Sequence, residues 1–411
     1  MDGTKVLISG AGIGGSAVAY WLHRFGFAPT VVERAAAPRP GGHAVDLRGA
    51  SPGVVERMGL LDEVRRRSLH ERGMAHVDAL GRTRATMAAE AFGGRGGVAD
   101  IEILRGDLAE ILTGATRDRV EYRYGEQITA LHQDADGVRV RFASGTEQRF
   151  DLVIGADGAH SRVRSLAFGP EERYVHPLGA YTAHYSISAE RAADDGLDLR
   201  DWFTVHSAVG RRMVATRPDR DGGVKAMFLF GSPPLGDALR DPAAQRALLH
   251  ERFADVGWQA PRMLAAMDSA EDFYFDAYAQ VRMPGWASGR AVLLGDAAFS
   301  PSPITGQGTN LALVGAYVLA GELALAGDDP LAGAANYERA LRGYVQRNQK
   351  LPPGGVNAML PGSRWAIRLG HLLTRAMGSR FVEPLAARAL FTEDDFTPRD
   401  YPSELSAPAT A

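Results

Sequence analysis

A glycine-rich turn close to the amino terminus is the first feature of this sequence that can do chemistry. Residues Gly10 to Gly15 read GAGIGG and match G-x-G-x-x-G directly after a short apolar run. In such a turn the first glycine permits the tight bend, Gly12 lets the backbone approach a pyrophosphate, and the last lets helix pack on strand. The N–H groups that open the following helix, at Ile13 and Gly14, then face the phosphates. The pattern predicts a dinucleotide site, with a ligand-free glycine-rich turn as the alternative.

An acidic residue further along supports this interpretation. Glu33 stands 23 positions after Gly10, at the end of the next apolar run. A carboxylate at that place can accept hydrogen bonds from ribose hydroxyls. Arg34 follows it directly and is expected to approach the adenosine. Strand, turn, helix, strand and acid therefore occur in the order that a βαβ dinucleotide-binding unit requires.

Two later segments carry further candidate ligand contacts. Asp157 lies in DLVIGADGAHSRVR, and Asp296 lies in GDAAFSPSPITGQGTN. Both segments follow or contain a short apolar run, and ligands of an open α/β sheet bind beyond the carboxyl ends of its strands. The alternatives are a solvated turn or helix cap for the acids and a plain turning loop for Gly306 and Gly308.

Together, the three segments resemble the motifs of class A flavoprotein monooxygenases, the para-hydroxybenzoate-hydroxylase-like enzymes. The second is similar to the family's D-x3-G-A-D-G-x2-S-x-V-R. The third is similar to G-D-A-A-H-x3-P-x2-G-Q-G-x-N, with Phe299 in place of the histidine. The resemblance is closest to the shorter members, which include tetracycline-inactivating and polyketide-hydroxylase-like enzymes.

The resemblance implies an FAD-dependent monooxygenase that consumes NADPH or NADH and O2. Such an enzyme hydroxylates an aromatic or polyketide-like small molecule through a flavin hydroperoxide, so that the cofactor supplies the difficult chemistry. No catalytic side chain is assigned on this basis, and no metal site is expected. The sequence has a single dinucleotide fingerprint, which suggests that the nicotinamide cofactor binds only transiently.

The resemblance also assigns cofactor contacts residue by residue. Arg105 begins an R-x-x-L segment that contacts FAD in the family, and Arg48, with Asp46 beside it, lies where flavin and pyrophosphate contacts are placed. A solvated surface charge is the alternative for each arginine. The expected cofactor residues are Gly10, Gly12, Ile13, Gly14, Gly15, Glu33, Arg34, Asp46, Arg48, Arg105, Asp157, Asp296, Pro303, Gly306, Gly308 and Asn310.

Hydropathy patterns predict an α/β fold with a Rossmann-like FAD-binding domain and an inserted substrate domain. Short apolar runs favour buried parallel strands, whereas the alternation over residues 174–230 favours an antiparallel sheet. Helices are expected at 14–25, 53–68, 106–112, 241–268, 307–326 and 363–390. The FAD-binding domain would comprise 1–73, 101–172 and 283–350, the substrate domain 74–100 and 173–282, and a C-terminal bridging helix 351–395, before a disordered tail at 402–411.

The inserted sheet is expected to form the roof of a substrate pocket. His184 is the best polar candidate for substrate contact, and Thr182 and Ser186, of the same parity along the strand, would share its face. A histidine bonded within the sheet is the alternative. The other expected substrate residues are Phe203, Met213, Lys225, Phe230 and Ile304.

Composition narrows the class of protein. Apolar residues make up 45% and charged residues 23% of the 411 positions, as in ordinary globular proteins. The net charge of -3 is unlike that of a nucleic-acid binder. The absence of cysteine excludes disulfides, cysteine-ligated metals and redox dithiols, and it fits a reducing cytoplasm. We expect a monomer or homodimer with a small-molecule substrate, no nucleic-acid partner and no membrane span.

Other functions are open at this stage. Tetracycline-type antibiotic inactivation and Baeyer–Villiger oxygenation fit the same motifs. A flavin-dependent halogenase shares the fold, but its W-x-W-x-I-P signature is missing because the five tryptophans are isolated. An FAD-binding ligand sensor without activity is the alternative from another class. The amphipathic C-terminal segment either packs across both domains, which we favour, or lies on a membrane surface.

Overall fold

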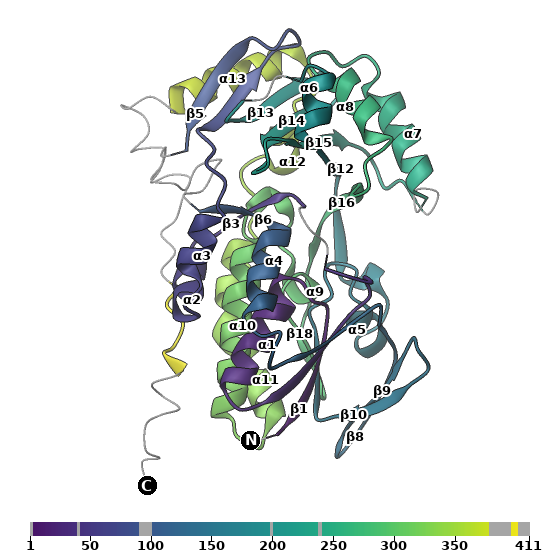
Figure 1. Cartoon of the computed structure of the whole chain (residues 1–411), viewed down its shortest axis with the longest axis vertical. Coiled ribbons are helices and arrows are strands. Elements are labelled where there is room, and N and C mark those ends of the chain that lie inside the picture. The colour runs from purple at the N-terminus through teal and green to yellow at the C-terminus, as the bar shows by residue number, and fades with distance from the viewer. Residues whose placement is uncertain are drawn as a thin grey trace.

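The structure is a computed structural model of the chain. It describes residues 3–38, 42–89, 101–197, 200–236, 241–377 and 396–401. Figure 1 shows two sheet-based halves stacked along the long axis of the molecule. One half holds the amino terminus and the longest helices, and helix α13 lies at the far end of the other half (Figure 1).

A six-stranded sheet forms the centre of the first half. Its order is β17-β18-β11-β1-β2-β7, and all neighbours are parallel except β17 with β18. The strands are β17 (Ala287–Ser288), β18 (Ala291–Leu293), β11 (Leu152–Gly155), β1 (Lys5–Ser9), β2 (Ala28–Glu33) and β7 (Glu121–Tyr124). Val6, Leu7 and Ile8 of β1 are fully buried. Such continuous apolar runs are typical of parallel strands covered on both faces.

Four helices pack on this sheet and on one another. They are α1 (Ile13–Arg24), α4 (Arg105–Gly114), α10 (Gly308–Leu325) and α11 (Pro330–Asn348). By length and composition α10 could cross a membrane, but 89% of it is buried inside the protein. Its apolar surface therefore reflects its place in the core, where the rings of Trp21 and Tyr317 lie 4.6 Å apart.

A seven-stranded sheet forms the second half. Its order is β16-β12-β15-β14-β13-β4-β5, and only β13 and β4 pair in parallel. The strands are β16 (Tyr274–Val281), β12 (Val175–Ile187), β15 (Val224–Gly231), β14 (Arg212–Pro218), β13 (Phe203–Ala208), β4 (Gly73–Val77) and β5 (Thr83–Ala88). Helices α7 (Pro242–Phe253) and α8 (Ala260–Met267) cover one face, and their apolar side chains pack with those of β12 and β15.

Shorter elements connect the two halves and complete each of them. They are β3 (Ala44–Asp46) paired with β6 (Glu102–Leu104), the meander β8 (Ile128–Asp134), β9 (Gly137–Phe142) and β10 (Glu147–Phe150), the helices α2 (Ser51–Arg57), α3 (Leu61–Arg66), α5 (Arg162–Ala167), α6 (Ala189–Asp194), α9 (Asp296–Phe299), α12 (Gly355–Met359) and α13 (Arg364–Met377), and the 3-10 turns η1 (Glu171–Arg173) and η3 (Pro303–Thr305).

The predicted α/β class, with an antiparallel sheet inserted into a Rossmann-like fold, is confirmed, but several helices differ from their predicted spans. The helix expected at 53–68 is two helices, because Gly59 turns the chain with φ +74°. The one expected at 241–268 is also two. Helix α11 was not predicted, although its start carries Asp329 as a side-chain cap and Pro330 in the first turn.

Part of the expected C-terminal region lies outside the described residues. The structure describes α13 to Met377, and the expected continuation of this helix to residue 390 is not among the described residues. The same holds for the expected tail at 402–411 and for residues 90–100 of the expected substrate domain. The division into domains stays a prediction.

Candidate active site

A large cavity lies between the two halves of the molecule. Its volume is about 2950 Å3, and its lining runs from the loops after β1, β2, β11 and β18 to one face of α13. Sites for single small molecules usually measure ~300–1,000 Å3. The cavity is therefore large enough for an extended dinucleotide and a second molecule. It begins at the carboxyl ends of the parallel strands, where ligands of open α/β sheets bind.

The glycine-rich turn and Arg105 meet at one side of this cavity. Gly10 has φ +102°, and a Cβ there would lie 2.6 Å from the Ala156 carbonyl oxygen. A Cβ on Gly15 would lie 1.8 Å from the Gly10 oxygen, so helix and strand touch backbone to backbone. At Gly12 the nearest atom to such a Cβ is Nη2 of Arg105, at 3.7 Å. The turn thus presents a helix N-terminus and a guanidinium to the same space, which suits a pyrophosphate.

Glu33 also lies beside the turn. Its Oε2 accepts a hydrogen bond from the Ala11 N–H at 3.0 Å, and its Oε1 accepts one from the Ala35 N–H at 2.9 Å. An ionised carboxylate offers about four acceptor sites, so acceptor capacity remains for two ribose hydroxyls. Arg34 is exposed and lines the same end of the cavity.

Asp157 borders the cavity, but its carboxylate is occupied by the protein itself. It accepts hydrogen bonds from Ser9 Oγ at 3.2 Å, from Ser161 Oγ at 2.5 Å, and from the N–H groups of Arg162 and Val163 at 2.9 and 3.2 Å. Burial raises the pKa of Asp157, and the hydrogen bonds partly offset this effect. These bonds hold the turn that follows β11 in place against β1.

Asp296 opens α9 directly after a buried strand. Its side chain is accessible from the cavity, yet protein surrounds it on the other sides. Burial raises the pKa of its carboxyl, while a hydrogen bond with Ser300 and the positive charge of Arg105 lower it. A carboxylate placed in this way can accept hydrogen bonds from the hydroxyls of a ligand.

The loop between α9 and α10 forms a second wall of the cavity. Pro303, Gly306 and Gly308 line it, and Gly308 is the first residue of α10. Ser302 has φ +75°, a backbone conformation that residues with side chains rarely adopt, and its buried Oγ has no hydrogen-bond partner among the residues that the structure describes. Strained residues of this kind cluster at ligand sites.

Asp46 and Arg48 lie against the same loop. The Arg48 Nε donates to Asp46 Oδ2 at 2.7 Å, and both residues line the cavity. A Cβ on Gly306 would lie 3.4 Å from this Asp46 oxygen. The acid and the base are therefore within reach of one ligand, but they also bind each other.

The structure places Asn310 away from the cavity. Its side chain is fully buried, and its Nδ2 donates to Gln307 Oε1 at 2.8 Å and to the Tyr344 hydroxyl at 2.6 Å. Asn310 is the third residue of α10 and is rotated by ~200° around the helix axis from Gly308, so its side chain faces α11. We therefore correct the predicted cofactor contact to a role in holding Gln307 and the start of α10.

Five of the six predicted substrate residues line the cavity: His184, Phe203, Met213 and Lys225 in the roof, and Ile304 in the loop between α9 and α10. Phe230 is the exception, because it packs on the opposite face of the sheet among the side chains of α7. Side chains alternate along a strand, so Lys225 and Phe230, five positions apart on β15, face opposite sides. The prediction for Phe230 was wrong for this reason.

The ammonium group of Lys225 is less available for contact with a substrate than the sequence suggested. Its Nζ donates to Ser186 Oγ at 2.7 Å and pairs with Asp219 at 2.8 Å. The ammonium group thus has its partners within the protein. Its alkyl chain contributes to the cavity wall.

His184 offers a hydrogen-bond acceptor to the cavity. Burial lowers its pKa to about 4, so the imidazole is neutral at pH 7. Its Nε2 lies 3.0 Å from Thr182 Oγ1, and that hydroxyl donates its single proton to the Phe228 carbonyl oxygen at 3.1 Å. The hydrogen-bond network therefore assigns the proton to Nε2 and leaves Nδ1 as an acceptor.

His43 was not predicted and lies beside His184. Their ring centroids are 5.4 Å apart. Burial lowers the pKa of His43 well below its ordinary value, and the electrostatic effects of His184, Arg105 and Arg217 act in the same direction. Two neutral imidazoles therefore line the middle of the cavity, where Tyr274 also contributes to the wall.

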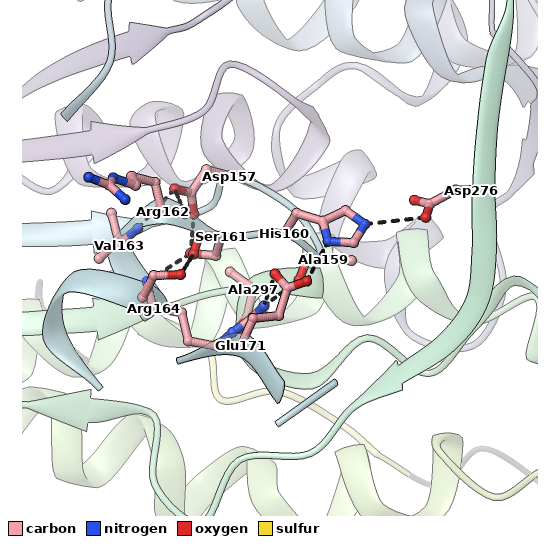
Figure 2. Close-up of polar contacts among 11 residues, drawn as sticks. Asp157, Ala159, His160, Ser161, Arg162, Val163, Arg164, Glu171, Asp276 and Ala297 are labelled. Carbon is pink, nitrogen blue, oxygen red and sulfur yellow. Dashed lines mark hydrogen bonds and ion pairs between the residues drawn. The ribbon is translucent and has the colours of Figure 1, made fainter. Parts of the chain in front are cut away.

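A polar cluster ties the two halves together, as Figure 2 shows. His160 Nδ1 lies 2.8 Å from Glu171, and its Nε2 lies 3.2 Å from Asp276 on β16. Hydrogen bonds to Asp276 and Glu171 raise the pKa of His160 to about 10, so it carries a positive charge at pH 7. Asp276 also accepts a hydrogen bond from the Tyr274 hydroxyl at 2.7 Å.

Arg164 belongs to the same cluster and is completely buried. Its guanidinium donates to the carbonyl oxygens of Ala297 at 3.1 Å and Ala159 at 2.5 Å, and it pairs with Glu171 at 3.1 Å (Figure 2). It therefore joins the segment after β11 to α9. Sequence reasoning gave His160 and Asp276 no role, and no local pattern links two residues 116 positions apart.

No group of three or more potential metal-binding side chains occurs among the residues that the structure describes. The polar groups of the cavity instead suit hydrogen bonding and charge pairing with an organic ligand.

Comparison with known proteins connects this geometry to a family. A model of the FAD binding domain matches residues 3–347. A flavin-dependent monooxygenase of Legionella longbeachae serogroup 1 (strain NSW150) is 40% identical over 348 residues, which cover 84% of this chain and 87% of the relative. The uncharacterized protein Rv1260 of Mycobacterium tuberculosis is 43% identical over 375 residues, which cover 90% of this chain and 98% of the relative.

Among solved structures, the crystal structure of tetracycline destructase Tet(51) is similar to this chain. The TM-score is 0.78 at 33% sequence identity, and the match covers 95% of this chain and 99% of that one. At 95% coverage the similarity extends over both halves of the chain. It confirms the predicted resemblance to class A flavoprotein monooxygenases, and the names of the relatives favour an enzyme over a ligand sensor. The chain belongs to the FAD binding domain family and is an FAD-dependent monooxygenase.

Proposed function

We propose that the protein hydroxylates an aromatic or polyketide-like polycyclic compound, with FAD held along the carboxyl edge of the six-stranded sheet. The proposal rests above all on the cavity, whose volume of about 2950 Å3 exceeds the needs of one small ligand. Its lining changes from charged residues at the glycine-rich turn to a mixed apolar roof under the seven-stranded sheet. The two parts suit a dinucleotide and a polycyclic substrate, respectively.

The residues of the first part fit FAD. Gly12 and Arg105 would hold the pyrophosphate, and Glu33 a ribose. Asp296 would accept hydrogen bonds from the ribityl hydroxyls, and the N–H groups at Gly308 would face the flavin ring. The fit is supported by the open space at Gly12, where the Arg105 guanidinium is, among the described residues apart from the chain neighbours of Gly12, the one group within 4 Å of where a Cβ would lie.

FAD, when bound, supplies electron transfer from NADPH or NADH and the activation of O2. The chain has to hold the substrate in the correct orientation and exclude water. Phe203 and Met213 provide apolar contact in the roof, and Ile304 provides it in the loop between α9 and α10. His184 Nδ1 would accept a hydrogen bond from a hydroxyl of the substrate, which orients the ring and favours phenolic or enolic compounds.

The tetracycline-type alternative has support of its own, because the similarity to tetracycline destructase Tet(51) spans 95% of this chain. We propose it as one member of the same polycyclic substrate class. We also propose that the chain divides into the FAD-binding and substrate domains predicted above. It works in the cytoplasm as a monomer or homodimer, and the nicotinamide cofactor binds only transiently.

Purified protein tests the proposal. It should be yellow and should oxidise NADPH faster when phenolic or polycyclic compounds, including tetracycline, are added. The product should gain one oxygen atom, and mass spectrometry of a reaction run under 18O2 should show that this atom comes from O2. The NMR spectrum of the product distinguishes hydroxylation from Baeyer–Villiger insertion. Stimulated NADPH oxidation that releases only hydrogen peroxide with every compound would refute the substrate class while leaving the flavoenzyme intact.

A further inference from the structure

Helix α13 carries an unusual outer surface. Eight large apolar side chains in the described part of the chain are exposed, and four of them lie on this one helix. They form the apolar stripe, which consists of Trp365 (72% exposed), Leu369 (36%), Leu372 (62%) and Leu373 (52%). At 100° per residue these positions fall on one side of the helix. Single exposed apolar residues are ordinary, but such a cluster marks an interaction surface.

The opposite side of α13 is already in use. Ile367, Gly370, His371 and Thr374 line the cavity, and the helix packs on β5 and β13. The apolar stripe therefore points away from the protein. Figure 1 shows α13 at the end of the molecule farthest from the amino terminus.

Positive charge runs along the edge of the stripe. Arg364, Arg368 and Arg375 form the arginine flank, and all three are exposed. None of them has an ion-pair partner among the residues that the structure describes, whereas Arg82 and Arg84 nearby share Asp78. The helix contains no acidic residue. An apolar stripe with tryptophan, beside unpaired arginines, is the pattern of helices that lie in a lipid headgroup layer.

We propose that α13 docks this protein on a lipid surface that contains anionic headgroups. Trp365, Leu372 and their neighbours would enter the boundary between headgroups and acyl chains, and the arginine flank would pair with the headgroup charges. The helix would then lie in the plane of the surface, between the lipid and the cavity.

A second copy of the chain fits this surface less well. A two-fold contact brings the same patch of both copies together, so the arginine flank would meet itself without an acid on either helix. Stable interfaces also need ~800 Å2 from each partner, which four side chains of one helix do not supply. Charge complementarity therefore favours an anionic lipid surface.

Vesicle flotation with the FAD-loaded full-length protein tests the inference without any substrate. Vesicles of phosphatidylcholine with phosphatidylglycerol should carry the protein upward, whereas vesicles of phosphatidylcholine alone should not. High salt should weaken the binding. Trp365 provides a second readout, because it is exposed whereas the other four tryptophans are buried or half-buried, and its emission should shift to the blue on binding.

Two variants and two controls make the test specific to α13. Leu372→Gln should lower the vesicle partition coefficient about tenfold. The double variant Arg364→Gln/Arg368→Gln should lower it about 25-fold at low salt, because each arginine contributes a factor of about five. Leu331→Gln, an apolar side chain exposed to 48% on α11, and the exposed pair Arg119→Gln/Arg139→Gln should bind like the unaltered protein.

Three outcomes would overturn the inference. One is the absence of flotation with anionic vesicles. Another is unchanged binding by both α13 variants while FAD content and the circular dichroism spectrum show them to be folded. The third is a dimer in light scattering that Leu372→Gln dissociates, since this would assign the stripe to a second copy. Because none of these measurements uses a substrate, they stand apart from the test of the proposed oxygenation.

Discussion

Single residues in the site divide into those that shape the backbone and those that meet the ligand. Among the glycines of the turn, Gly15 has the first role and Gly12 the second. Gly15→Ala places a Cβ 1.8 Å from the Gly10 oxygen, so we expect it to destabilise the apoprotein by ~1–3 kcal/mol. The Cβ of Gly12→Ala would meet no atom of the described part of the chain, apart from its chain neighbours, closer than 3.7 Å, so the change in stability should be less than ~0.5 kcal/mol. The substitution should nevertheless weaken FAD binding, because the methyl group would stand where the pyrophosphate approaches.

Urea unfolding of both apoproteins and FAD titration by flavin fluorescence provide the comparison. If Gly12→Ala bound FAD as tightly as the unaltered protein, the pyrophosphate would not lie against this turn. If Gly15→Ala were as stable as the unaltered protein, the close contact of helix and strand would not be required.

His184 presents the clearest prediction about substrate. Its Nδ1 is the free acceptor because Nε2–H is committed to Thr182, whose own proton goes to the Phe228 oxygen. His184→Leu should lower kcat/KM for a hydroxylated substrate by about 5- to 10-fold, since one net hydrogen bond contributes ~1 kcal/mol. The O-methyl analogue of the same compound should change by less than about twofold, because it has no proton to donate. Steady-state NADPH oxidation measures both, and an equal loss for the two compounds would show that His184 acts only by packing.

At the scale of elements, His160 ties the segment after β11 to strand β16 through Glu171 and Asp276. Its pKa of about 10 in the folded protein lies above the usual value of 6.5. The stabilisation is therefore fully present below about pH 6.5 and is lost as the pH rises through 10. His160→Gln should lower the melting temperature at pH 6 and have little effect above pH 10. Because the His160 side chain is 55% exposed, solvent screens the pair and the effect at pH 6 should not exceed ~1 kcal/mol.

The exposed residue His132, on β8, supplies the matched control for this prediction. His132→Gln should leave the melting temperature unchanged across the same pH range. A difference between His160→Gln and the unaltered protein that grew with pH would contradict the charged state assigned to His160.

The direction in which side chains point along a strand or helix explains two wrong predictions. On β15, Lys225 faces the cavity and Phe230 faces α7, as the alternation along a strand requires. Asn310 turned out to face α11 for the corresponding reason in a helix. Both errors concern the direction of a side chain and leave its element correctly predicted, so closer attention to periodicity would have excluded Phe230 from the pocket.

At the scale of the whole molecule, the residues near the carboxyl terminus return to the FAD-binding half. Tyr401 is almost fully buried, and its hydroxyl donates to Glu322 of α10 at 2.9 Å. Its ring fills a notch at Gly321, where a Cβ would lie 2.3 Å from a ring atom. Phe396 stacks on Tyr344 of α11, with ring centroids 4.4 Å apart. The last described residues thus form part of the core of a fold whose first strand, β1, ends at Ser9.

Tyr401 therefore contributes to global stability. Tyr401→Ala should lower the free energy of unfolding by ~3–5 kcal/mol, because it leaves a large cavity. Tyr401→Phe keeps the ring and removes only the hydrogen bond to Glu322, which should cost ~1 kcal/mol. Urea unfolding measures both, and a Tyr401→Ala variant as stable as Tyr401→Phe would show that the segment 396–401 does not dock.

The sequence by itself determined the class of fold, the dinucleotide turn and the family of enzyme. These depend on local requirements: a positive φ at Gly10, a backbone contact at Gly15, and an acid at the end of a buried strand, each visible in a few consecutive residues. Only the tertiary structure decided which side chains meet across the cavity. The pairing of His160 with Asp276, the protonation of His184 and the outward stripe of α13 depend on which distant elements pack together. That choice results from the burial of many apolar side chains at once, and no single stretch of the chain carries it.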